Sequence, residues 1–278
     1  MFPGANADRE AAQYVLLGAP LDASTSFVPG ARFGPDRLRR YAEPFDDYDR
    51  RTDSSVSDHA VHDAGDLRPW DDVTDYLDFL AGELGDARRD GAVPIILGGE
   101  HTVTYAGVEA TDPDVLVCLD AHLDLRDAFD GSRWSHACVT RRALDVVDEA
   151  VVVGARTGSR EEYERAAADD VTVVDPEAVA DWDPDYGSTD VYLSVDVDAA
   201  DPSVAPGTGT MEPFGLSGRE MRDVVRAVAS HAVGFDVVEV NDRDDGQTAA
   251  LGAKLLREFV HSHADAAGDS LPPTEDGD

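Results

Sequence analysis

Short apolar runs alternate with amphipathic segments along most of this chain. Residues 73–90 carry apolar side chains at helical spacing on one face, whereas the run 93–97 that follows is apolar throughout. Further runs expected to form strands lie at residues 14–17, 60–67, 115–119, 150–153, 171–174, 191–195 and 235–240. Because strands that alternate with helices imply right-handed crossovers, the pattern predicts an α/β fold with a mainly parallel sheet covered on both faces.

The sequence contains no internal repeat and no linker that would divide it. A length of 278 residues suits one large α/β domain, which we expect over residues 1–263. Residues 264–278 are acidic and contain Pro and Gly, so they predict a disordered tail.

The charge balance is extreme, with 58 acidic against 23 basic residues and a net charge of −35. Such a surface repels nucleic acids and anionic membranes, so neither is an expected partner. Lys254 is the sole lysine, and an acid-rich, lysine-poor composition indicates a salt-rich cytosol and a halophilic source.

The expected compartment is the cytoplasm. Cys118 and Cys138 are the only cysteines, which indicates no disulfide framework. The N-terminus has neither the basic start nor the apolar stretch of a signal peptide, and no apolar segment approaches the length that spans a bilayer.

Side chains that bind metals or protons follow four of the expected strands. These are His101 after 93–97, then Asp120, His122 and Asp124 after 115–119, then Asp196 and Asp198 after 191–195, and Glu239 at the end of the last run. In parallel sheets the carboxyl ends of the strands meet at one edge, where ligands bind. The sequence therefore predicts one site at that edge.

The six histidine and aspartate side chains indicate the chemistry of this site. Structural zinc sites prefer tetrahedral Cys and His sets, and calcium prefers oxygen ligands alone. A mixed, carboxylate-rich set favours a pair of Mn²⁺-like ions, and two such ions can convert a shared water to hydroxide, which predicts a hydrolase. A single structural metal, or an acidic edge without metal, is the alternative interpretation.

At these residues the chain resembles the ureohydrolase family, which includes arginase, agmatinase, guanidinobutyrase and formimidoylglutamase. The resemblance extends from about Tyr14 to about His263 and rests on GGEHT at 98–102, DAHLD at 120–124, SVDVDAADPSVAPGTGT at 194–210, PGARFGP at 29–35 and EVND at 239–242. It implies a three-layer α/β/α sandwich with a mostly parallel sheet of about eight strands, assembled as a homo-oligomer, a trimer or hexamer.

The resemblance also implies the role of each matched residue. Two Mn²⁺ ions per subunit are expected, with His101, Asp120 and Asp124 on one ion, His122 and Asp198 on the other, and Asp120 and Asp196 bridging both. Asp124 is expected to accept the proton of the attacking hydroxide, His136 to pass a proton to the leaving amine, and Glu239 to hold the guanidinium.

The segment SHACVTRR at 135–142 resembles archaeal-type agmatinases, and GGEHT carries a glutamate where arginases commonly have an aspartate. We therefore predict hydrolysis of agmatine to putrescine and urea, a step of polyamine biosynthesis. The alternatives are guanidinobutyrase, arginase or formimidoylglutamase activity, or a non-catalytic metal-binding regulatory relative. Loss of a ligand would mark the last class, and every ligand position is filled here.

Overall fold

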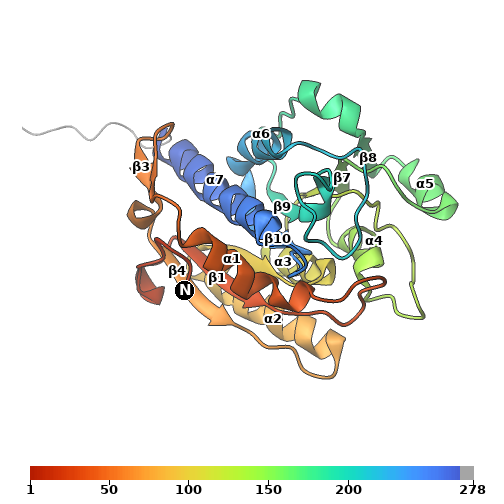
Figure 1. Ribbon diagram of the computed structural model, residues 1–278, viewed down its shortest axis with the longest axis horizontal. Helices are drawn as coiled ribbons and strands as arrows, with labels where there is room; N and C mark the ends of the chain where they lie inside the picture. Colours follow the sequence, from red (N-terminus) through yellow and green to blue (C-terminus); the bar gives the residue numbers. More distant parts are fainter. Residues whose placement is uncertain (270–278) are drawn as a thin grey trace, which may run out of the picture.

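The computed structural model describes residues 1–269, which fold around an eight-stranded sheet (Figure 1). Every neighbouring pair of strands is parallel, in the order β4-β1-β5-β10-β9-β6-β7-β8. The strands are β1 Tyr14–Ala19, β4 Val61–Asp66, β5 Val93–Gly98, β6 Val115–Leu119, β7 Glu149–Val153, β8 Val171–Val174, β9 Val191–Asp196 and β10 Ala232–Val238. The predicted fold class is confirmed.

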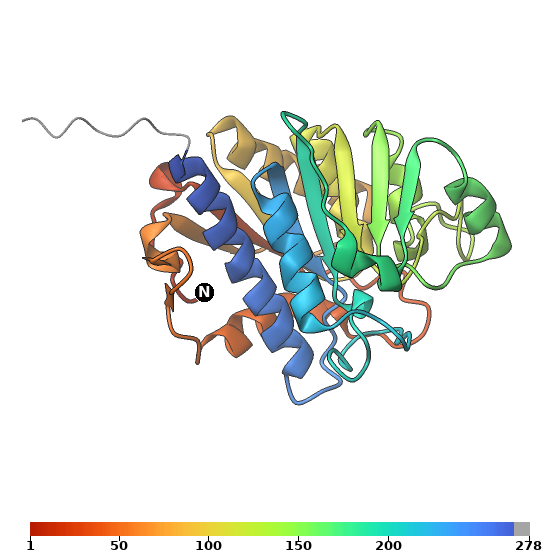
Figure 2. The same ribbon diagram turned by 90° about the horizontal axis from the view of Figure 1, so that it is seen from above.

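Helices cover both faces of this sheet, so the molecule has three layers. The helices are α1 Gly34–Ala42, α2 Val73–Arg89, α3 Thr104–Thr111, α4 Val139–Ala143, α5 Arg160–Ala166, α6 Gly218–Ala229 and α7 Gln247–Asp269. Helices α6 and α7 lie side by side over one face (Figure 2), and α1 packs beside α7. Helices α2, α3 and α4 form the layer on the other face. None of the helices in residues 1–269 combines the length and apolar character needed to cross a membrane.

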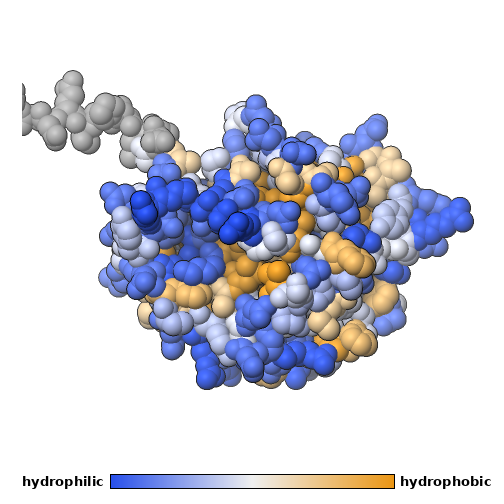
Figure 3. Space-filling model, turned by 45° about the horizontal axis from the view of Figure 1, so that its top comes forward, coloured by the Kyte–Doolittle hydropathy of each residue, from blue (hydrophilic) through white to orange (hydrophobic). Residues whose placement is uncertain are grey.

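The run 93–97 is apolar without interruption because both faces of strand β5 are buried. Ile95 and Leu97 pack in the core on the side of α1, while Ile96 packs in the core under α2 and α3. Successive side chains of a strand point to opposite faces, and both faces are covered here. Most of the charged residues lie on the outer surfaces, and hydrophilic residues cover much of the face in Figure 3.

Helix α7 corrects the expected boundary of the tail. The helix was expected over 251–263 and disorder from residue 264, but the helix runs from Gln247 to Asp269. Ala264 packs against the main core, and residues 265–267 contain neither Pro nor Gly, so the helix continues and ends at Asp269, directly after Gly268. The rest of the predicted tail, 270–278, lies outside the described residues.

A small antiparallel hairpin was not predicted. It pairs β2 Tyr48–Asp49 with β3 Ser54–Ser55. Its strands are polar and two residues long, so they carry no apolar run by which a sequence pattern reveals a strand.

The strand order determines where the functional residues meet. Strands β10 and β9 lie between β5 and β6, so the carboxyl ends of β5, β10, β9 and β6 are four neighbours in the sheet. These are the four strands after which the sequence places its ligand-type side chains.

Candidate functional site

A cavity of about 240 Å³ lies at the carboxyl ends of these four strands. Its lining includes His101, His122, Asp124, Asp196 and Asp198, together with His136 and Glu239. Asp120 lies fully buried against both imidazoles at the same place. The structure therefore brings together all the residues that the sequence predicted for the site.

His101 is the centre of one half of the cluster. It stands in a 3₁₀ turn, His101–Val103, directly after β5, and is buried. Its Nδ1 lies 3.0 Å from Oδ2 of Asp124, 3.2 Å from Oδ2 of Asp120 and 3.5 Å from Oδ2 of Asp196. One ring nitrogen thus faces three carboxylates.

His122 forms the other half and is partly exposed to the cavity. Its Nδ1 lies 3.0 Å from Oδ2 of Asp198 and 3.5 Å from Oδ1 of Asp120. Oδ2 of Asp120 is buried and accepts no hydrogen bond of good geometry, although Nδ1 of His101 lies 3.2 Å away. A buried carboxylate oxygen without a donor is costly, so this atom fits a bound cation.

Backbone N–H groups hold the carboxylates of the motifs at 120–124 and 196–198 in place. The N–H of His122 donates to Oδ1 of Asp120 at 2.7 Å, and that of Asp198 donates to Oδ1 of Asp196 at 2.8 Å. The N–H of Ala121 donates to Oδ1 of Asp198 at 3.0 Å. Each bond engages one oxygen, which orients the other toward the imidazoles.

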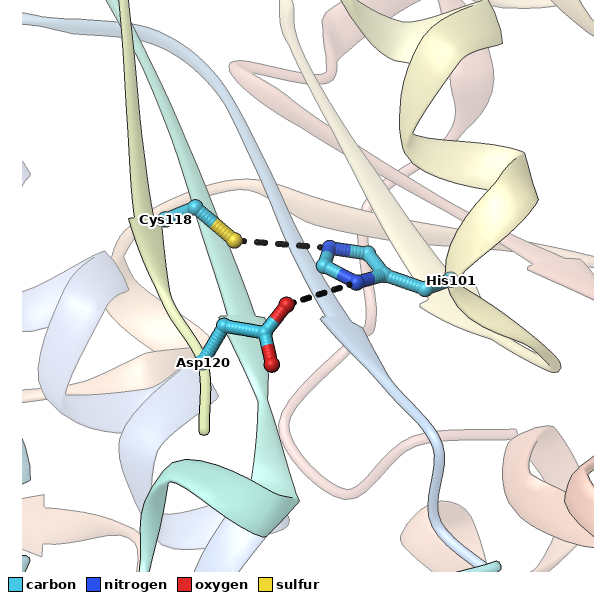
Figure 4. A group of neighbouring side chains, drawn as sticks. All are labelled: His101, Cys118 and Asp120. Atoms are coloured by element: carbon cyan, nitrogen blue, oxygen red, sulfur yellow. Dashed lines mark hydrogen bonds and ion pairs between the residues drawn. The ribbon is translucent and has the colours of Figure 1, made fainter. Parts of the chain in front are cut away.

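The second ring nitrogen of His101 faces away from the carboxylates. Figure 4 shows Cys118 and Asp120 against different nitrogens of the imidazole, with the sulfur 3.4 Å from Nε2. Nε2 also lies 3.2 Å from Oγ of Ser194, which donates to Asp236 at 2.6 Å. Partners of this kind hold a metal-binding imidazole in one orientation, here with Nδ1 toward the site. The contact of Cys118 with His101 was not predicted.

The surroundings of both imidazoles raise their pKa values, which favours the protonated form. Burial lowers the pKa of His101, but the adjacent Cys118 and Asp120 raise it well above its ordinary value. Burial likewise opposes the charge on His122, and Asp198 and Asp120 raise its pKa far above the ordinary range.

The remaining carboxylates repel one another. Burial raises the pKa of Asp124, and the charge on Asp120 raises it further. Burial and the charges on Asp198 and Asp120 raise the pKa of Asp196 well above its ordinary value. Divalent cations would relieve this repulsion, so the donor set fits a metal site.

Two functional carboxylates stand on left-handed backbone. Asp124 has φ 50° and Glu239 has φ 61°, a region that side chains other than glycine rarely adopt. Strand β10 ends at Val238, so Glu239 lies just beyond it instead of inside the predicted strand 235–240. Its Oε1 accepts the N–H of His101 at 2.8 Å, and burial raises its pKa to about 8.

His136 reaches the cavity from a loop, in the 3₁₀ turn His136–Cys138. Its Nδ1 lies 3.1 Å from Oγ of Ser24 and its Nε2 lies 3.2 Å from Oγ of Ser26. The long Gly- and Pro-rich loop after β1 therefore packs against the loop that carries this histidine.

Several residues that hold the loops of the site in place were not among the predicted site residues. Buried Glu100 accepts hydrogen bonds from the loop after β1, and Arg156 donates to the backbone carbonyls of residues 198–200 and 212–213. Arg126 pairs with Glu162 at 3.2 Å and not with Asp127. A charged residue in the motif GGEHT, beside a strand end, was the available signal for Glu100.

Comparisons with known proteins agree with this geometry. The model of the arginase family matches residues 12–261. An agmatinase from Pyrococcus horikoshii is 36% identical over 90% of this chain and 91% of its own length. An N(1)-aminopropylagmatine ureohydrolase from Thermococcus kodakarensis is 35% identical over 89% of each chain. The crystal structure of agmatine ureohydrolase from Thermoplasma volcanium superposes with a TM-score of 0.90, at 34% identity, covering 97% of this chain and 96% of that one. The chain belongs to the arginase family.

Proposed function

We propose that this chain is a manganese-dependent hydrolase that cleaves the guanidino group of agmatine, releasing urea and putrescine. The observation that carries the proposal is the convergence of two imidazoles and four aspartates on one cavity that His136 and Glu239 also line. The names of the Pyrococcus and Thermoplasma relatives support agmatine as the substrate.

We propose two Mn²⁺ ions per subunit. Their ligands would be His101, Asp120 and Asp124 for one ion, His122 and Asp198 for the other, and Asp120 and Asp196 as bridges. The unpartnered Oδ2 of Asp120 and the mixed nitrogen and oxygen donors support this assignment. When bound, such a pair of ions acidifies water and so supplies a nucleophile at neutral pH.

Glu239 would bind and orient the guanidinium. The carboxylate is anchored through Oε1 to the backbone of His101, and Gly209 and Thr210 line the cavity beside it. A planar guanidinium presents paired N–H donors that match a carboxylate, and the charge of both partners strengthens the hydrogen bonds.

Asp124 and His136 would move the protons. Asp124 lines the cavity, where its carboxylate can accept a proton from the attacking water. His136 would then donate a proton to the amine nitrogen as the bond from the guanidino carbon to that nitrogen breaks. The nitrogen keeps the bonding electron pair and leaves as part of putrescine, while the carbon leaves in urea.

A longer guanidino substrate, such as N(1)-aminopropylagmatine, is the second candidate. A neighbouring cavity of about 400 Å³ shares Arg126, Ser159 and Glu162 with the first. Asp127 and Glu161 line it together with Arg141 and Arg165, so a second ammonium group of a longer tail would meet carboxylates next to guanidinium groups there. The name of the Thermococcus relative supports this candidate.

A urea-release assay on manganese-loaded protein tests the proposal. The substrates are agmatine, N(1)-aminopropylagmatine, arginine, guanidinobutyrate and formimidoylglutamate, the last followed by release of formamide. Agmatine should give the highest kcat/KM. A higher kcat/KM for the aminopropyl compound would favour the second candidate, and no turnover of any guanidino compound would refute the hydrolase.

We also propose a cytoplasmic homo-oligomer, a trimer or hexamer. Phe27, Met211 and Phe214 are exposed on loops, and an interface between subunits would cover them. Both cysteines are buried and free, which suits a reducing compartment. Light scattering of the purified protein in concentrated KCl would test the assembly, and a monomer would contradict it.

A further inference from the structure

Glu100 precedes a proposed metal ligand, His101, yet its carboxylate contacts a different part of the site. Its Oε2 accepts the backbone N–H groups of Ala23 at 2.5 Å and Ser24 at 2.7 Å. Its Oε1 accepts the hydroxyls of Ser24 and Thr102, each at 2.8 Å. The carboxylate is fully buried and surrounded by donors, so it acts as an acceptor only.

Ser24 links the Glu100 carboxylate to His136 through hydrogen bonds. A serine hydroxyl has one proton and two lone pairs. The proton of Ser24 points to Glu100, and one lone pair accepts the backbone N–H of His136 at 2.9 Å. The remaining lone pair faces Nδ1 of His136 at 3.1 Å. An unprotonated Nδ1 would set two lone pairs against each other, so Nδ1 carries the hydrogen.

The other neighbours of the ring agree with this assignment. Ser135 Oγ lies 3.4 Å from Nδ1, a longer contact than that of Ser24. On the opposite side, Ser26 Oγ lies 3.2 Å from Nε2, and both residues line the cavity. The Ser26 hydroxyl can donate to an unprotonated Nε2. The hydrogen-bond network thus defines which nitrogen of the neutral ring carries the hydrogen, Nδ1, and which carries the lone pair, Nε2.

We infer that Glu100 and Ser24 are positioning residues that hold His136 as the Nδ1–H tautomer, with the Nε2 lone pair toward the substrate cavity. The role of this arrangement in turnover rests on the proposed function. Neutral His136 takes a proton from solvent at Nε2 and then gives it to the leaving amine nitrogen. Nδ1–H donates to Ser24 in both the neutral and the charged ring, so the network stays unchanged through the proton cycle.

The first test measures the tautomer in metal-free protein, without any turnover. Protein with ¹⁵N-labelled histidine is studied by long-range ¹H–¹⁵N NMR above the pH at which the ring titrates, and His136→Gln identifies the resonance. Wild type should show the proton on Nδ1. Ser24→Ala should show Nε2–H at a substantial population, and the matched change Ser135→Ala should leave the Nδ1–H form. A wild-type ring protonated on Nε2 would overturn the inference.

The second test asks whether Ser24 acts through His136. Ser24→Ala should lower kcat about tenfold, with KM and manganese content unchanged, and Glu100→Gln should add little to it. In a His136→Asn background, Ser24→Ala should have no further effect on kcat. An equal loss in both backgrounds would mean a merely structural role and would overturn the inference. If wild type releases no urea, the proposed function fails, whereas the NMR result still decides the tautomer.

Discussion

His101 and His122 face the two different oxygens of one carboxylate, that of Asp120. The first lies 3.2 Å from Oδ2 through its Nδ1, and the second lies 3.5 Å from Oδ1 through its own Nδ1. A residue between two imidazoles in this way belongs to both halves of the cluster. Its loss should therefore affect both proposed metal positions at once.

Replacement of Asp120 by Ala is expected to empty both positions. After dialysis, wild type should retain about two Mn²⁺ ions per chain and the variant less than half an ion, with urea release abolished. Elemental analysis checks this. Asp127→Ala, an exposed aspartate of the next loop that pairs with Arg142, is the matched control and should keep its metal. Unchanged metal content in D120A would contradict the bridging role.

Glu239→Gln tests the guanidinium contact. Loss of a hydrogen bond between charged groups costs about 1.5–3 kcal/mol, so kcat/KM for agmatine should fall roughly 10- to 150-fold. Bound manganese should stay at the wild-type level, since Glu239 is not among the proposed ligands. Glu10→Gln, at the exposed N-terminal segment, should match wild type. A Glu239→Gln enzyme with wild-type kcat/KM would exclude the contact.

Removal of metal should destabilise the fold. The raised pKa values of Asp124 and Asp196 reflect burial and repulsion that cations relieve. A ligand at about 100 times its Kd stabilises by about 2.7 kcal/mol, so chelation should lower Tm by roughly 5–10 °C in a thermal scan. D120A should show no response to added manganese. Equal Tm values for wild type with and without chelator would argue against a built metal site.

Two histidines outside the site should make stability depend on pH. His59 and His261 lie ring to ring at 5.4 Å, and burial lowers the pKa of both below 6.5. The unfolded chain therefore binds protons first as the pH falls, so their contribution is present above about 6.5 and is lost below it. Urea unfolding at pH 7.5 and pH 5.5 should show this loss, and a double change to Gln should reduce it. If the double variant loses as much stability between pH 7.5 and pH 5.5 as wild type does, other groups cause the loss.

Salt dependence follows from the net charge of −35. Raising KCl from about 0.1 M to about 1 M shortens the screening length from about 10 Å to about 3 Å, which weakens repulsion between surface carboxylates. The free energy of unfolding should rise accordingly, as measured by tryptophan fluorescence in urea. A protein that stays folded and active in salt-free buffer would refute the predicted halophilic source.

The central strands of the sheet were predictable because both of their faces are buried. Runs such as 93–97 and 115–119 are apolar at every position and end where polar residues begin. Their order in the sheet was not predictable from the pattern, because hydrophobic periodicity does not encode which strands pair. The insertion of β10 and β9 between β5 and β6 is a contact between segments more than 70 residues apart.

The candidate site, too, could be predicted from the sequence only in part. The ligand-type side chains follow strands, so their placement at one edge of the sheet could be predicted from parallel strands, whereas their meeting in one cavity depends on the strand order. The contacts of Glu100 with Ser24 and of Arg126 with Glu162 depend on how long loops fold back, and no local pattern specifies that.

Asp124 and Glu239 are held on left-handed backbone, which costs roughly 1 kcal/mol or more for residues with a Cβ. Glycine at either position would relax the chain and remove a buried negative charge. Laboratory evolution of the metal-free protein for heat resistance alone should therefore discard these two carboxylates early, whereas bound metal would favour keeping Asp124. A screen for thermostable variants will keep the enzyme only if turnover is selected in the same round.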